Sequence, residues 1–148
     1  MLFKNICFIY LIIISYWDIR VGLIPNLITL CFFILAFISD IILSPADLPV
    51  HLLSSIFFFG VFFTGATITK GIGAGDIKMA AAIGYTLGYF KTAIVFTIAC
   101  AIGIVFFNIC HIYKKKMYKV PFAPFVLAGY SIAEVFGGGF FWLKNRLL

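Results

Sequence analysis

Long apolar runs make up most of the chain, and charged or turn-forming residues interrupt them at short intervals. A helix that spans a bilayer needs roughly 20 residues, within a range of about 17–25. The apolar residues are continuous and do not alternate with polar ones, which favours helices over the strands of a membrane barrel. The pattern predicts an all-α membrane protein, a polytopic bundle of about six transmembrane helices in a single domain, residues 1–148. The six expected helices are Leu2 to Trp17, Val21 to Ser39, Leu52 to Thr69, about Ile77 to Phe90, Thr92 to Cys110 and about Pro121 to Leu143.

Two of these runs are expected to depart from a simple span. The fourth is short, so its helix should begin near Asp76 or enter and leave the membrane on one side. The sixth contains Glu134 and the glycines 137–139, so we expect a kink or a break near its end. Gly84 and Gly88, four residues apart, should allow close helix packing near the candidate site.

The composition identifies lipid as the main solvent of the surface. Hydrophobic residues make up 64% of the chain and charged residues 11%, against about 45–50% and about 25% in soluble domains. The net charge of +6 could suggest nucleic acid, but the charges lie at the ends of the apolar runs. Charges there set membrane orientation, so we expect a lipid bilayer and no nucleic acid as partner.

The cysteines lie inside apolar runs and form no C-x-x-C pair, so they are interpreted as small buried hydrophobes, not as a metal site or a disulfide framework. No metal or cofactor is therefore expected. The first run is not interpreted as a cleaved signal, because no clear cleavage site follows it. The four cysteines are Cys7, Cys31, Cys100 and Cys110.

The distribution of Lys and Arg predicts the orientation. On the six-helix pattern the richer set of loops should face the cytoplasm, with both termini outside; the cluster from Lys114 to Lys119 dominates this prediction. The richer set holds seven basic residues: Arg20, Lys70, Lys78, Lys114, Lys115, Lys116 and Lys119. The other set holds four, Lys4, Lys91, Lys144 and Arg146, together with Asp40 and Asp47.

The acidic residues carry the candidate chemistry, because an acid at membrane depth is expensive and suggests a function. Asp18 ends the first run and Asp76 opens the fourth, 58 residues later, so both are expected at one membrane boundary. Asp40 and Asp47 belong to the opposite boundary. Glu134 should lie roughly 20 Å along its helix from the site, too far to join the pair.

Two neighbouring carboxylates in a partly desolvated place share a proton and titrate as a unit. One can take a proton from water while the other polarises a substrate carbonyl, as in aspartic proteases. Glycines at alternate positions 71, 73 and 75 would let a peptide backbone approach Asp76. The alternative for Asp18 is a capping role at a helix end.

Three motifs resemble those of the type IV prepilin peptidases. Gly73-Ala74-Gly75-Asp76 with Lys78 resembles the GxGD signature and its lysine, and Asp18 followed by Ile24-Pro25-Asn26 resembles the first aspartate and its turn. Pro121-Phe122-Ala123-Pro124-Phe125 resembles the late proline motif. The resemblance implies Asp18 and Asp76 as the catalytic pair. The supporting residues are Pro25, Asn26, Gly73, Gly75, Lys78, Pro121 and Pro124, with Pro25 and Pro121 expected in the first turns of their helices.

The same resemblance implies a hydrolase, an aspartic endopeptidase of the cytoplasmic membrane. Its substrate would be a prepilin or pseudopilin precursor, cleaved at the cytoplasmic boundary. Many family members carry an N-terminal region with paired cysteines and also N-methylate the pilin. The first run begins at residue 2 and no paired cysteines occur, so we expect a short, peptidase-core member.

Two other classes of function remain as alternatives. A small proton- or cation-coupled transporter or channel would also place acids in the membrane, although transporters often show internal repeats and none is found here. A non-catalytic subunit for secretion or pilus assembly would predict that neither aspartate is needed for precursor processing.

Overall fold

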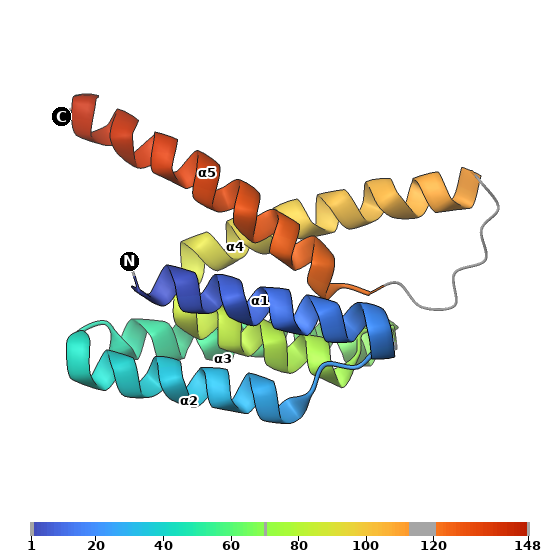
Figure 1. The fold of residues 1–148 in the computed structure, drawn as a ribbon, viewed down its shortest axis with the longest axis horizontal. Helices are drawn as coiled ribbons and strands as arrows, with labels where there is room; N and C mark the ends of the chain where they lie inside the picture. Colours follow the sequence, from blue (N-terminus) through green and yellow to red (C-terminus); the bar gives the residue numbers. More distant parts are fainter. Residues whose placement is uncertain (1, 70, 113–120, 148) are drawn as a thin grey trace.

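The computed structural model describes residues 2–69, 71–112 and 121–147, and over these ranges the chain forms helices joined by short turns (Figure 1). The helices are α1 (Leu2–Val21), α2 (Asn26–Leu43), α3 (Leu48–Thr69), α4 (Ala74–Ile112) and α5 (Ala123–Leu147). Among the described residues, α2, α3 and α4 are long and apolar enough to cross a membrane, and the part of α5 over Ala123–Phe136 is a shorter apolar helix. The polytopic helical bundle expected from the sequence is confirmed.

The helix α4 contains a reversal that makes it two helices in space. It has 39 residues, and at 1.5 Å per residue this is about twice the ~30 Å of a bilayer core. At Gly88 the backbone leaves the helical region, with φ 71° and ψ 175°. On either side of this point the two halves run in opposite directions (Figure 1). The expected fourth and fifth helices are therefore both present, with their boundary at Gly88 and no separate loop.

Several expected boundaries change. α1 continues to Val21, so Asp18 lies inside the helix and not at its end. α2 begins at Asn26, because Gly22 adopts a positive φ of 65° and ends the first helix in a turn. The expected break at glycines 137–139 is wrong: α5 is one helix from Ala123 to Leu147. Glycine in a helix costs about 1 kcal/mol relative to alanine but does not forbid the helical conformation.

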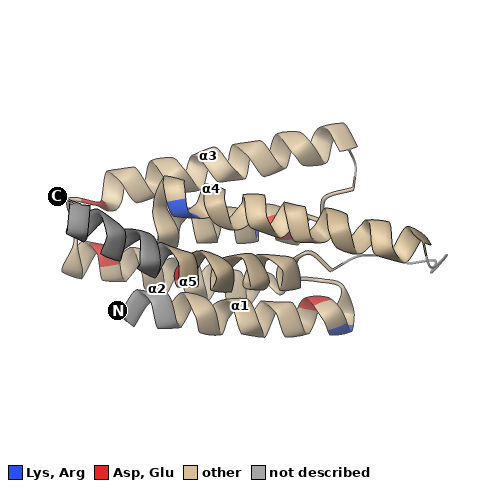
Figure 2. Cartoon of the chain, turned by 90° about the horizontal axis from the view of Figure 1, so that it is seen from above, with Lys and Arg blue, Asp and Glu red and all other residues tan. Residues whose placement is uncertain are grey.

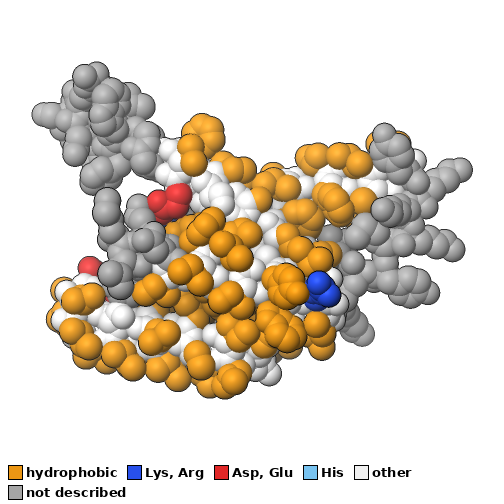
Figure 3. Space-filling model, viewed as in Figure 1, with side chains coloured by type: hydrophobic (Ala, Val, Ile, Leu, Met, Phe, Trp, Pro, Cys, Tyr) orange, Lys and Arg blue, Asp and Glu red, His pale blue; other side chains and the backbone are white. Residues whose placement is uncertain are grey.

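Large apolar side chains are spread over the described surface in the view of Figure 3, as expected of a lipid-facing bundle. Leu27, Ile68 and Phe90 are 72%, 76% and 80% exposed. Charged residues are few along the helices (Figure 2). Cys7 is buried as expected, but Cys31 and Cys100 are exposed on the apolar surface, so the interpretation of all four cysteines as buried is wrong.

Close helix crossings occur where a glycine removes the side chain. A Cβ at Gly84 would lie 3.1 Å from the carbonyl oxygen of Ser54 on α3, which confirms the close packing expected there. A Cβ at Gly129 of α5 would lie 2.6 Å from the carbonyl oxygen of Val95 on the second half of α4. Gly88 forms the reversal instead of a packing contact.

The helices alternate in direction and so define two ends of the bundle (Figure 1). The term site end is used for the side of the bundle at which α1 and α3 terminate and at which α2, α4 and α5 begin. We call the far end the one that holds the turn between α2 and α3 and the reversal at Gly88. Gly88 is thus remote from the candidate site, contrary to expectation.

Candidate active site

Asp18 joins α1 to the beginning of α5. Its residue is 7% exposed, and its carboxylate oxygen Oδ2 accepts a hydrogen bond of 3.0 Å from the backbone N–H of Ala123. Ala123 is fully buried and is the first residue of α5. The first N–H groups of a helix have no partner inside that helix, and a carboxylate there also interacts favourably with the helix dipole. The capping role considered for Asp18 is therefore present, but for a helix 105 residues away.

The late proline motif builds the helix start that faces Asp18. The carbonyl oxygen of Phe122 accepts hydrogen bonds from the N–H groups of Phe125 and Val126, at 3.0 and 3.3 Å. Pro124 is the second residue of α5, where a missing N–H costs nothing. Pro121 lies before the helix, so the expectation that Pro121 occupies the first turn is wrong, and Pro124 occupies it.

Asp76 closes its own glycine loop. The N–H of Gly73 donates to Asp76 Oδ2 at 3.2 Å, and the N–H of Asp76 donates to the carbonyl oxygen of Gly73 at 3.0 Å. A Cβ at Gly73 would lie 3.3 Å from the same carboxylate oxygen. The absence of a side chain at position 73 therefore leaves room for the carboxylate of Asp76, which is half-buried.

Gly75 lets the turn after α1 pack against the start of α4. A Cβ at position 75 would lie 2.8 Å from the Cβ of Ile24 and 3.4 Å from its backbone nitrogen, so any side chain would displace this turn. Pro25 lies directly before α2, with φ −64° and ψ 121°. Its carbonyl oxygen accepts the N–H of Thr29 at 3.3 Å. Pro25 was expected in the first turn of α2. It lies directly before this turn instead, so that expectation is wrong.

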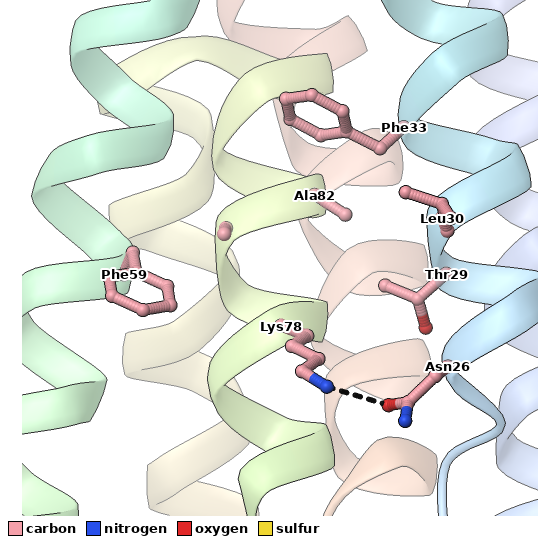
Figure 4. Close-up of a pocket in the computed structure, with 8 residues that line it drawn as sticks. Asn26, Thr29, Leu30, Phe33, Phe59, Lys78 and Ala82 are labelled. Atoms are coloured by element: carbon pink, nitrogen blue, oxygen red, sulfur yellow. Dashed lines mark hydrogen bonds between the residues drawn. The ribbon is translucent and has the colours of Figure 1, made fainter.

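Lys78 and Asn26 connect the two motifs directly. The ammonium group of Lys78 donates to the side-chain oxygen of Asn26 at 2.9 Å (Figure 4). This pair lies at one end of a mostly apolar groove of about 310 Å³ between α2, α3 and the first half of α4. The groove is lined by Asn26, Thr29, Leu30, Phe33, Phe59, Lys78, Ala81 and Ala82.

The acidic residues lie at different ends of the bundle, as the sequence predicted. Asp18 lies near the end of α1 and Asp76 near the start of α4, which both belong to the site end, and the Ile24–Gly75 and Asn26–Lys78 contacts join their segments. Asp47 lies in the turn between α2 and α3, at the far end.

The other two acids pair away from this end. Asp40 is 4% exposed and its Oδ2 lies 2.7 Å from Nδ1 of His51. Glu134 lies 3.7 Å from the ammonium group of Lys91. The sequence did not predict this pairing of His51 with a buried aspartate.

Ala123 and Ile24 lie inside the quoted motifs, but they were not among the residues expected to support the site. Both act through backbone atoms or through plain apolar contact, so no residue type marks them in the sequence. Lys70 and the cluster from Lys114 to Lys119, which dominated the predicted orientation, lie outside the described residues.

The chain is similar in sequence to a known protein family and to a curated protein. A sequence model of the type IV leader peptidase family matches residues 5–108. The prepilin leader peptidase/N-methyltransferase of Bacillus subtilis (strain 168) is 35% identical over 153 residues, which cover 99% of this chain and 61% of that relative. The chain thus spans less than two thirds of the relative's length. No solved structure matches the chain.

Proposed function

Because the chain belongs to the type IV leader peptidase family, we propose that it is a membrane-embedded aspartyl endopeptidase that cleaves the leader of prepilins or pseudopilins. The observation that supports this best is the gathering of Asp18 and Asp76 at one end of the bundle, on segments that touch through Ile24 and Gly75. The name of the Bacillus subtilis relative contains two activities, and the proposal assigns this pair of acids to the peptidase activity alone.

The proposed reaction needs two carboxyl groups and one water molecule. One ionised aspartate takes a proton from water, which attacks the carbonyl carbon of the scissile peptide bond. The other aspartate, protonated, donates a hydrogen bond to the carbonyl oxygen and stabilises the charge that develops on it. The two groups then exchange roles as the amine leaves, since the pair holds one shared proton.

The structure supports this proposal by holding each acid in place through backbone N–H groups. Asp18 is fixed by the start of α5 and Asp76 by its own glycine loop. Backbone donors lose little conformational freedom, so they orient a reacting group well. Neither interaction depends on a side chain that a substrate would have to displace.

The groove beside Lys78 suggests how a membrane-bound substrate approaches. It begins at the Asn26–Lys78 pair, one helical turn or less from Asp76, and continues between Phe33 and Phe59 (Figure 4). Its walls are mostly apolar and lie on α2, α3 and α4, which are long and apolar enough to cross a membrane, so we propose that the apolar segment of the precursor beside the cleaved bond rests there. The site end would then face the cytoplasm, in agreement with the distribution of Lys and Arg.

The test is cleavage of a co-expressed prepilin, followed as a shift on a gel. Wild type should cleave, whereas Asp18→Asn and Asp76→Asn should each lose activity by a factor of at least ~1,000, as expected when an acid–base group is removed. Asp47→Asn is the matched control, because Asp47 is an exposed aspartate at the far end. Equal cleavage by all four proteins would eliminate the aspartate mechanism and leave the assembly-subunit or transporter alternatives.

A further inference from the structure

Ser15 is a buried hydroxyl that the proposed mechanism does not yet use. The residue is 5% exposed, and its Oγ has no hydrogen-bond partner within the part of the chain that the structure describes. A buried polar group without a partner is unfavourable by about 1–3 kcal/mol. Such a group in an apolar interior indicates that something else binds to it.

Other hydroxyls in these helices show the usual way to avoid this cost. Each donates to the backbone carbonyl four residues earlier, at 2.8 or 2.9 Å: Thr64, Thr86, Thr97 and Ser131. Ser15 has an equivalent carbonyl in Leu11 of its own helix, yet it makes no such bond. Its hydroxyl is therefore available to the protein interior.

Ser15 and Asp18 lie on the same face of α1, one turn apart. Residues three apart on a helix have Cβ atoms about 5–6 Å from each other. Both are buried, whereas Tyr16 and Trp17 between them are exposed. Oδ2 of Asp18 is held by the N–H of Ala123, so Oδ1 is the oxygen that remains for another donor. The separation suits one water molecule between two polar groups.

We propose that Ser15 is a positioning residue for Asp18, which it holds through one buried water that donates to Oδ1. Together with the Ala123 N–H, this water would fix both oxygens of the carboxylate. This inference rests on the proposed peptidase function. A donor to a carboxylate stabilises its charged form, so Ser15 would also set the pH range over which the acid pair works.

The other ionisable groups at the site end are few. They are Asp76 and Lys78 near the start of α4, His111 in the last turn of α4, and Arg20 of α1; the described parts of α2, α3 and α5 add no acidic or basic residue at this end. Arg20 lies over the ring of Tyr16, 5.4 Å from its centre, on the exposed side of α1.

The experiment compares the pH dependence of prepilin cleavage for wild type, Ser15→Ala and Ser54→Ala in detergent-solubilised enzyme. Ser54 is the matched control, because it is 2% exposed and its Oγ also has no partner among the described residues, but it lies on α3. For Ser15→Ala we expect the acid limb of kcat/KM to move to higher pH by about half a unit or more. Ser54→Ala should keep the wild-type pH profile. Ser15→Thr, which retains a hydroxyl, should also keep it.

The outcomes separate this inference from the proposed function. If wild type cleaves, Asp18→Asn does not, and Ser15→Ala keeps the wild-type profile, the role of Ser15 is wrong while the peptidase assignment stands. An equal shift in both alanine variants would also overturn it, because the effect would then be a general one of helix packing. Cleavage by Asp18→Asn at the wild-type rate would remove the proposed function itself.

Discussion

At the scale of single residues, Gly75 determines how closely the first turn approaches Asp76. Ile24 occupies the space that a Cβ at position 75 would need, at 2.8 Å. Real Cβ atoms do not come so close, and the atom opposed is the Cβ of Ile24, which can move only with its backbone. Gly75 thus has a steric role in joining the two aspartate segments.

We predict that Gly75→Ala lowers prepilin cleavage by at least ~10-fold, because the displaced turn separates the acids and small misplacements of reacting groups are costly. Gly60→Ala is the control, since a Cβ at position 60 meets nothing within 4 Å. Both would be assayed at matched membrane levels. Wild-type activity in Gly75→Ala would contradict the need for close contact at Ile24.

The buried pair of Asp40 and His51 gives a second prediction at this scale. The two side chains lie 2.7 Å apart, and the ring of Tyr85 packs against the imidazole with ring centres 5.8 Å apart. His51→Ala would leave the Asp40 carboxylate buried without this partner, so we expect the protein to lose about 1–3 kcal/mol of stability.

Thermal unfolding in detergent would measure this loss. The double variant Asp40→Leu with His51→Leu should recover much of it, because apolar residues can replace a buried charged group and its partner at little cost. If His51→Ala unfolds at the wild-type temperature, the pair contributes nothing to the fold.

At the scale of elements, the reversal of α4 requires a glycine at position 88. Its φ of 71° and ψ of 175° fall in a region that is essentially restricted to glycine and costs other residues about 1–3 kcal/mol. We predict that Gly88→Ala destabilises the protein by about that amount. Gly103→Ala, in the second half of the same element, should be neutral, since its Cβ would make only an ordinary contact of 3.8 Å with Phe125. Thermal unfolding of the two variants, measured in parallel, would show whether only Gly88→Ala is destabilised.

The sequence predicted the elements well and their junctions less well. Charged and turn-forming residues mark the ends of apolar runs, so the intervals after α1, α2 and α3 were predicted close to their observed positions. The helix reversal was expected near Lys91 because that residue is charged, but Lys91 is helical and pairs with Glu134. Glycine occurs often inside membrane helices, so Gly88 gave no distinct sign that it alone reverses the chain.

The site was predictable to the level of which acids share an end of the bundle. Membrane topology alone separates Asp18 and Asp76 from Asp40 and Asp47. What the sequence could not supply was the contact of Asp18 with the N–H of Ala123, because that bond depends on where two distant helices cross. The proline motif was recognised, but its function as the frame of this N–H was not.

At the scale of the whole molecule, the two ends of the bundle should face opposite sides of the membrane. We predict that a single cysteine introduced by Leu23→Cys, in a variant without the native cysteines, is labelled only from the cytoplasm. Ala46→Cys should be labelled only from outside. Both positions are exposed in turns, one at each end, and membrane-impermeant reagents on intact and opened cells would distinguish them. Labelling of both from one side would contradict the alternating bundle.

The reversal inside α4 also bears on how the protein enters the membrane during synthesis. Most neighbouring spans are joined by a loop, which can remain in the aqueous phase while the next span is still being synthesised. The two halves of α4 have no such loop, because the chain is helical on both sides of Gly88. We therefore expect the two halves to be inserted together as one hairpin. The ribosome will therefore have to release most of residues 74–112 before the first of them takes its final place.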